Sequence, residues 1–134
     1  MPASGTLDQE RGAATLEFAL VAPLLMLLML AVLQFGLWYH AQGVVLAAAQ
    51  EAARVTAAED GTPTAGHARA RELLDAGLGT DAGSATVTVT RDARLARATI
   101  TASLRPLLPF TGGLRLRAEG RSFAEHFRPA GSPP

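Results

Sequence analysis

A long apolar segment near the N-terminus limits what this chain can fold into. Residues 18–33 contain no charged or strongly polar side chain, and after Gln34 the apolar run continues to Trp38 and Tyr39. As a helix, the roughly 22 residues from Phe18 to Tyr39 span about 33 Å, which matches the ~30 Å hydrocarbon core of a bilayer. Trp38 and Tyr39 lie at the far end, where aromatic side chains concentrate at membrane interfaces. The sequence therefore predicts a transmembrane helix.

A long apolar segment can also be a buried core helix or a cleaved secretory signal. A buried core helix is disfavoured because a chain of 134 residues has too little material to cover such a helix on all sides. A cleaved secretory signal would have a basic N-terminal region and a shorter apolar stretch. Here Asp8 and Glu10 accompany the single Arg11, and the small residues 47–49 lie well beyond the aromatic end. A secreted protein or enzyme released by signal peptidase stays open as an alternative.

The residues directly before the apolar run form a second feature. Gly12 precedes five residues that end in Glu17, and Phe18 follows at once. A carboxylate inside a spanning helix is unfavourable, by about 2.5–3.5 kcal/mol at the centre and less near the edge. Glu17 is therefore either a residue of the interface or a residue with a specific partner.

This pattern resembles the processing site of type IV-like prepilins. The longer string RGAATLEFALVAPLLMLLMLAVLQFG resembles the N-terminus of TadE-like pseudopilins of the tight-adherence (Flp) pilus system. The resemblance implies that a membrane-embedded prepilin peptidase cleaves after Gly12, so that Ala13 becomes the first residue and Glu17 the fifth. It also implies that Glu17 and Phe18 act in assembly, where Glu17 of one subunit meets the α-amino group of Ala13 of the next.

The helix is expected to continue past the membrane, from about Ala13 to about Ala58. Pro23 predicts a kink in it, because proline has no N–H for the bond to residue 19. Thr62 and Pro63 have the residue types of a helix cap and first turn, and they predict a second helix that Gly79 ends after Leu78. The apolar positions expected to face inward from the first helix recur at helical spacing: Leu37, Ala41, Val44, Ala48, Ala52 and Val55.

The remaining sequence alternates with the period of β-strands. Strands are predicted at residues 86–90, 98–104 and 114–119, with a turn at 92–95. Because each strand has one apolar face, they predict a small antiparallel sheet covered by both helices. The fold class is therefore α+β and pilin-like. A fainter similarity to the TadE-like tail extends over these strands, the segment Leu107-Leu108-Pro109-Phe110 and Glu125.

These elements divide the chain into four parts. Residues 1–12 are a cytoplasmic leader, 13–39 the transmembrane helix, 40–128 an extracytoplasmic domain and 129–134 a disordered tail. Arg11 favours a cytoplasmic N-terminus. The expected location is the cell membrane, in a single pass, or a surface pilus. The expected partners are the lipid bilayer, a prepilin peptidase, other pilin or pseudopilin subunits and the pilus assembly platform.

Little in the sequence indicates catalysis. The formal net charge is zero, there is no Cys, and the three histidines, His40, His67 and His126, are far apart. No phosphate-binding loop or nucleophile motif occurs. The sequence predicts a non-enzymatic subunit with no cofactor or metal, no nucleic acid and no small-molecule substrate. The leading hypothesis is a TadE-like pseudopilin or minor pilus subunit. The alternative is a single-pass membrane protein whose exported domain binds something unrelated to pili.

Overall fold

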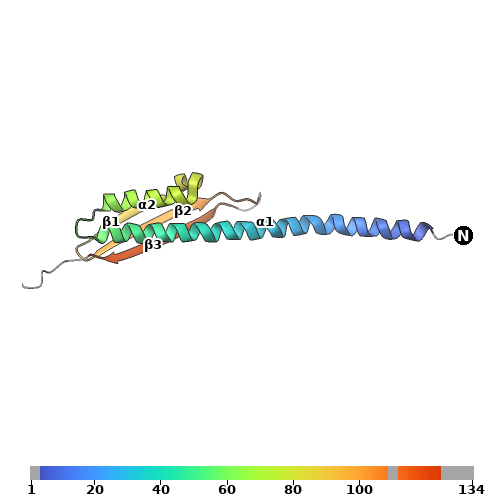
Figure 1. The fold of residues 1–134 in the computed structure, drawn as a ribbon, viewed down its shortest axis with the longest axis horizontal. Helices are drawn as coiled ribbons and strands as arrows, with labels where there is room; N and C mark the ends of the chain where they lie inside the picture. The colour runs from blue at the N-terminus through green and yellow to red at the C-terminus, as the bar shows by residue number, and fades with distance from the viewer. Residues whose placement is uncertain (1–3, 109–111, 125–134) are drawn as a thin grey trace, which may run out of the picture.

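The computed structural model describes residues 4–108 and 112–124 and has the predicted α+β architecture. One very long helix extends far beyond a small domain, in which a second helix and a sheet lie along its C-terminal half (Figure 1). The predicted tail, together with Pro109, Phe110, Glu125 and His126, lies outside the described residues. The elements in chain order are α1 (Ser4–Ala57), α2 (Pro63–Leu78), the 3-10 helix η1 (Gly79–Ser84), β1 (Thr86–Arg91), β2 (Leu95–Leu104) and β3 (Leu114–Phe123).

Helix α1 is continuous from Ser4 to Ala57 and passes through Pro23 without a break. It begins earlier than the predicted Ala13, because residues 7–11 are Leu, Asp, Gln, Glu and Arg, most of which favour helix. At its C-terminal end the guanidinium of Arg91, from β1, donates to the carbonyl oxygens of Thr56 and Ala58 at 2.9 and 3.1 Å, and also to that of Gly61. These bonds satisfy carbonyls that have no partner within the helix.

Helix α2 has the predicted ends. The Thr62 side chain accepts a hydrogen bond from the backbone N–H of Ala65 at 3.1 Å, and Pro63 occupies the first turn. Gly79 ends the helix with a φ of 55°, a left-handed conformation that glycine adopts without a steric penalty. The inward face of the helix is apolar: Ala70 and Leu74 are buried, while Leu73 and Leu78 are partly buried against the core. The short η1 that follows was not predicted.

The sheet is antiparallel with the strand order β1-β2-β3. The predicted turn is one residue too long, since Leu95 already belongs to β2 and its carbonyl accepts from Asp92 N at 2.8 Å. β3 is also longer than predicted, because it pairs with the whole of β2 from Leu104↔Leu114 to Leu95↔Phe123. The buried apolar positions of one sheet face are Val87, Ala96, Ala98, Ile100, Ala102, Leu116 and Ala118.

The core forms where the second half of α1 meets this sheet face. The buried side chains of α1 are small, so the helix backbone approaches the strands closely. A close approach occurs at Gly120 in β3, which lies against the carbonyl of Ala49. The prediction was wrong for Leu37, whose side chain is half exposed. The buried residues of α1 in this core are Ala41, Val45, Ala48, Ala49, Ala52 and Ala53.

The close approach at Gly120 predicts a strong effect of one added methyl group. In Gly120→Ala the new Cβ would clash with the backbone of Ala49 and Gln50, and we expect a loss of about 1–3 kcal/mol, typical of overpacking. The matched control is Gly113→Ala, whose Cβ would lie 3.5 Å from the nearest atom, Leu104 O. Urea unfolding in detergent, followed through the single Trp38, measures both variants. Equal stabilities would show that α1 and β3 do not meet as described.

Candidate functional site: the exposed apolar helix and its junction with the domain

The apolar side chains of residues 12–33 of α1 are not covered by the domain in the described part of the chain. From residue 12 to residue 33 every side chain is exposed, except Ala22 and Leu30, which are half-buried. By length and composition this is a candidate membrane-spanning helix, and none of its most apolar window is buried. An apolar surface this extensive must be covered by lipid or by other helices. Its most exposed large side chains are Leu16, Phe18, Leu20, Leu24, Met26 and Met29.

The predicted processing motif lies at the end of this helix that is far from the domain. Ala13 and Glu17 are four residues apart in α1 and therefore share one face of the helix. Phe18 and Glu17 are both exposed, and a side chain added at Gly12 would meet no atom within 4 Å. The helical rise puts Glu17 about 26 Å from Gln34 along the axis. The described chain thus presents the whole motif to a partner.

Pro23 lies on the same exposed part of α1. It removes the hydrogen bond that residue 23 would donate to the carbonyl of Ala19. The helix nonetheless runs through this position. The kink at Pro23 stays a prediction.

Gln34 marks the junction between the exposed helix and the domain, whereas in the sequence it is only an interruption of the apolar run. It is the first buried residue along α1, with 8% of its surface exposed. Its side-chain oxygen accepts a hydrogen bond of 2.6 Å from the backbone N–H of Leu107, in the connection between β2 and β3. The sequence signal for this contact was a single amide within an apolar run, because a polar group that is buried requires a hydrogen-bond partner.

Three aromatic side chains lie together on one side of α1, next to Gln34 along the helix. The ring of Phe35 lies 6.0 Å from that of Trp38 and 6.5 Å from that of Tyr39. Phe35 and Tyr39 are exposed, while Trp38 packs partly against the core. Gln42, two turns beyond Gln34, donates from its side-chain amide to the carbonyl of Arg117 in β3 at 3.1 Å. The two glutamines thus connect α1 to both ends of the segment 107–117.

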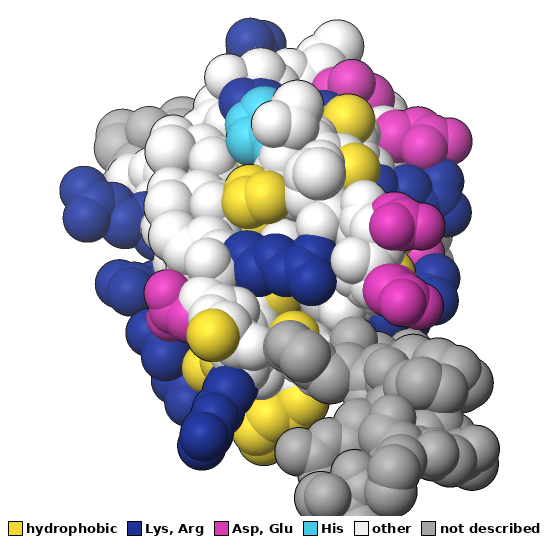
Figure 2. All heavy atoms as spheres, turned by 90° about the vertical axis from the view of Figure 1, so that its left-hand side faces the viewer, with side chains coloured by type: hydrophobic (Ala, Val, Ile, Leu, Met, Phe, Trp, Pro, Cys, Tyr) yellow, Lys and Arg dark blue, Asp and Glu magenta, His cyan; other side chains and the backbone are white. Residues whose placement is uncertain are grey.

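The opposite end of the molecule is polar. Figure 2 shows basic side chains along one flank of this end, acidic and basic side chains together on the other, and only small separate apolar areas. On α1, Glu51 lies 2.8 Å from Arg54 and 3.7 Å from Arg69 of α2. The hydrogen bond from Arg54 lowers the pKa of Glu51. A general acid or base instead needs a pKa close to the working pH.

The outer face of the sheet has a second group of charges. Glu119 lies 2.7 Å from Arg121 and 3.1 Å from Arg97, and the hydrogen bond from Arg121 lowers its pKa. Because Arg97 and Arg121 are about half exposed or more, these ion pairs add little to stability. They keep Glu119 ionised on a face that is otherwise basic.

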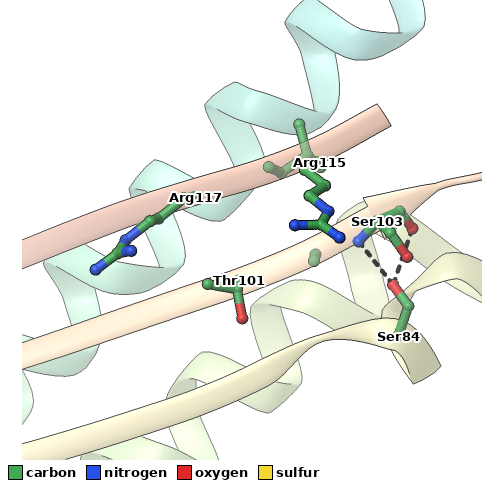
Figure 3. Close-up of a pocket in the computed structure, with 7 residues that line it drawn as sticks. Ser84, Thr101, Ser103, Arg115 and Arg117 are labelled. Carbon is green, nitrogen blue, oxygen red and sulfur yellow. Dashed lines mark hydrogen bonds between the residues drawn. The ribbon is translucent and has the colours of Figure 1, made fainter. Parts of the chain in front are cut away.

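A shallow hollow on this face lies between β2, β3 and η1 (Figure 3). Ser84 Oγ accepts from the backbone N–H of Ser103 at 3.0 Å and also lies 2.9 Å from its carbonyl oxygen, which fixes η1 to the sheet. Arg115 and Arg117 contribute the charge of the lining, which contains no carboxylate and no histidine. This lining offers no nucleophile and base pair of the kind that covalent catalysis uses.

Neither described histidine belongs to a metal-binding group. His40 lies exposed on α1 and His67 exposed on α2. Among the described residues no three His, Cys, Asp or Glu side chains are close enough to hold a metal ion.

Comparison with known families adds to this geometry. Residues 12–54 match the family model of TadE-like protein. We call these matched residues the TadE-like segment. It begins at Gly12 and ends at Arg54, so it contains the predicted processing motif, the exposed apolar helix and most of the Ala-rich face that packs on the sheet.

The fainter similarity of the strands lies outside the matched residues, since α2 and the sheet follow Arg54. No curated protein and no solved structure matches the chain. The similarity to the TadE-like family is therefore confined to residues 12–54, where it suggests a pilus-related role. The same residues include the candidate membrane-spanning helix.

The bond at Gln34 gives a testable consequence. In Gln34→Ala the N–H of Leu107 loses its acceptor, and a net hydrogen bond of about 0.5–1.5 kcal/mol corresponds to amide exchange about 2- to 10-fold faster. Hydrogen–deuterium exchange of the peptide containing Leu107, in detergent, measures it. Gln42→Ala is the matched control, because it removes the bond to Arg117 O and leaves Leu107 N bonded. Equal exchange in the two variants would contradict the contact.

Proposed function

We propose that this chain is a TadE-like pseudopilin or minor pilus subunit that takes part in assembling or anchoring a tight-adherence pilus. One observation carries the proposal. The TadE-like segment presents an apolar helix directly after the Gly12–Glu17–Phe18 motif, and most of its large apolar side chains are exposed. Such a helix suits lateral association with lipid first and with similar helices later.

The proposed topology is a single pass with the N-terminus in the cytoplasm. The domain of α2 and the sheet then lies outside the cytoplasm. The proposed partners are the lipid bilayer, a prepilin peptidase, other pilin or pseudopilin subunits and the assembly platform. The role is one of assembly rather than catalysis, which agrees with the lowered pKa values of Glu51 and Glu119 and with the lining of the hollow beside Ser84.

Processing after Gly12 gives the first test of this proposal. Co-expression with a prepilin peptidase should yield a mature chain that begins at Ala13, because Gly12 and Glu17 have the spacing of the motif. Intact mass and N-terminal sequencing of membrane-extracted protein measure the cleavage site. Gly12→Val should block the cleavage, while Gly36→Val, within the same helix and equally open, should not. A mature chain that begins beyond residue 49 would instead identify a secretory signal.

Glu17 gives the second test. After cleavage the α-amino group of Ala13 carries a positive charge at neutral pH, and both charges lie where solvation by water is poor. A desolvated pair of this kind specifies register between helices more than it adds net stability. Within one helix Glu17 also places a negative charge near the positive N-terminal end.

We therefore expect Glu17→Gln to insert into the membrane normally and yet to assemble poorly. Loss of about 1.4 kcal/mol from each contact would lower the yield of crosslinked pilus partners about tenfold. Glu17→Asp is the control, because it keeps the charge. The measurement compares partner yield and pilus formation at matched expression. Full pilus formation by Glu17→Gln would show that Glu17 is only an interfacial residue.

A further inference from the structure

The junction between α1 and the domain lies inside the predicted membrane segment. The β2–β3 connection is bonded to α1 at Gln34, whereas the predicted span continues to Tyr39, about 8 Å further along the helix. Phe35 and Tyr39 still expose 64% and 71% of their surfaces. The helix therefore remains apolar on its free side at the height where the β2–β3 connection meets it.

The thickness of a bilayer gives this overlap a physical meaning. Residues 18–33 alone form about 24 Å of helix, which is shorter than the ~30 Å hydrocarbon core. At the N-terminal end of this segment, lipid can cover the missing length only by burying Glu17, which is unfavourable. At the C-terminal end it can cover residues 34–39, which end in the aromatic rings expected at an interface. The second arrangement places the β2–β3 connection at the membrane surface.

The described part of that connection has the side chains for such a position. Leu107 is 48% exposed although it is apolar. Its backbone N–H is bonded to Gln34, so this polar group is already satisfied close to lipid. Arg105 exposes 85% of its side chain, and its closest ionic partner is Asp81 at 3.7 Å. Arg115, the second residue of β3, lies on the outer sheet face and pairs with Ser103 (Figure 3).

Arginine side chains at this height suit the lipid headgroups. Their long apolar stems can lie along an apolar surface while the guanidinium stays in the polar layer. Lipid phosphates carry the complementary charge, and arginine recognises phosphate with several donors. Leu107 below and Arg105 and Arg115 above thus follow the order of layers in a leaflet, from acyl chain to phosphate.

We propose that residues 105–108 are seated in the headgroup interface of the bilayer that α1 spans. Leu107 inserts toward the acyl chains, and Arg105 and Arg115 contact lipid phosphates. The inference rests on the membrane anchoring proposed above. It adds that the domain sits at a fixed height relative to the bilayer. The bond between Gln34 and Leu107 holds the connection against the helix at that height.

The absence of cysteine from the sequence allows a direct test with single-cysteine variants of the full chain. Leu107→Cys, Arg115→Cys and Arg94→Cys, the last at the other end of the sheet, are labelled with bimane. The labelled chains are reconstituted at low protein density into phosphatidylcholine–phosphatidylglycerol vesicles. Lipids carrying a spin label near the headgroup then quench the fluorescence of nearby dyes. We expect the strongest quenching at 107, weaker quenching at 115 and none at 94.

A fourth variant separates this inference from the proposed function. Leu27→Cys lies in the middle of the exposed helix and reports insertion through spin labels at the bilayer centre. Quenching at 27 together with no quenching at 107 would overturn the inference and leave the membrane anchor standing. No quenching at 27 would refute the anchor itself. In a parallel sample, unlabelled Leu107→Cys chains are treated with a mild oxidant. Disulfide formation between two copies there, together with no lipid quenching of the labelled chains, would show that a second copy occupies this surface and would also overturn the inference.

Discussion

The contact between the Ala-rich face of α1 and the apolar face of the sheet supports the rest of the structure. Six small side chains on α1 form the buried surface, so the strands approach the helix backbone itself at Gly120. Dispersion depends steeply on separation, and close packing of many small groups compensates for the little area that each alanine buries. The domain also needs this helix because three strands and one short helix would leave the inner sheet face partly open to water.

The same helix belongs to two environments, and the change occurs within a few residues. N-terminal to Gln34 most apolar side chains are exposed, and C-terminal to it the small side chains are buried. The continuous helix links the exposed part to the part that folds as a domain. The hydrogen bond between Gln34 and the β2–β3 connection is a second link.

Periodicity predicted most of the fold because each signal was local. The caps at Thr62 and Gly79, the apolar run and the alternating strands depend on residues adjacent in sequence, and the structure has them at nearly the predicted bounds. The outer ends of the strands were missed, since the length of β3 is set by pairing with β2. Leu37 was predicted to face inward but is half exposed, because periodicity gives a direction but not the extent of the partner surface.

In the candidate site, too, the sequence predicts local features but not the contacts between distant residues. Gly12, Ala13, Glu17 and Phe18 form a contiguous pattern that can be read from the sequence, and the match to TadE-like protein begins at its first residue. The roles of Gln34 and Arg91 depend on partners that lie 73 and about 30 residues away along the chain. No local sequence pattern predicts these partners, because the packing of the helix against the sheet determines which groups meet.

The continuity of α1 has a mechanical consequence. No linker separates the apolar half of the helix from the half that carries the sheet, so the domain follows every change in the inclination of the helix. Spanning helices tilt by about 20° on average, and over the roughly 35 Å from Gln34 to Ala57 such a tilt moves the far end of the domain sideways by about 12 Å. A neighbouring helix that altered the tilt within the bilayer would thereby reposition the surface formed by Arg91, Arg94 and α2, without any conformational change inside the domain.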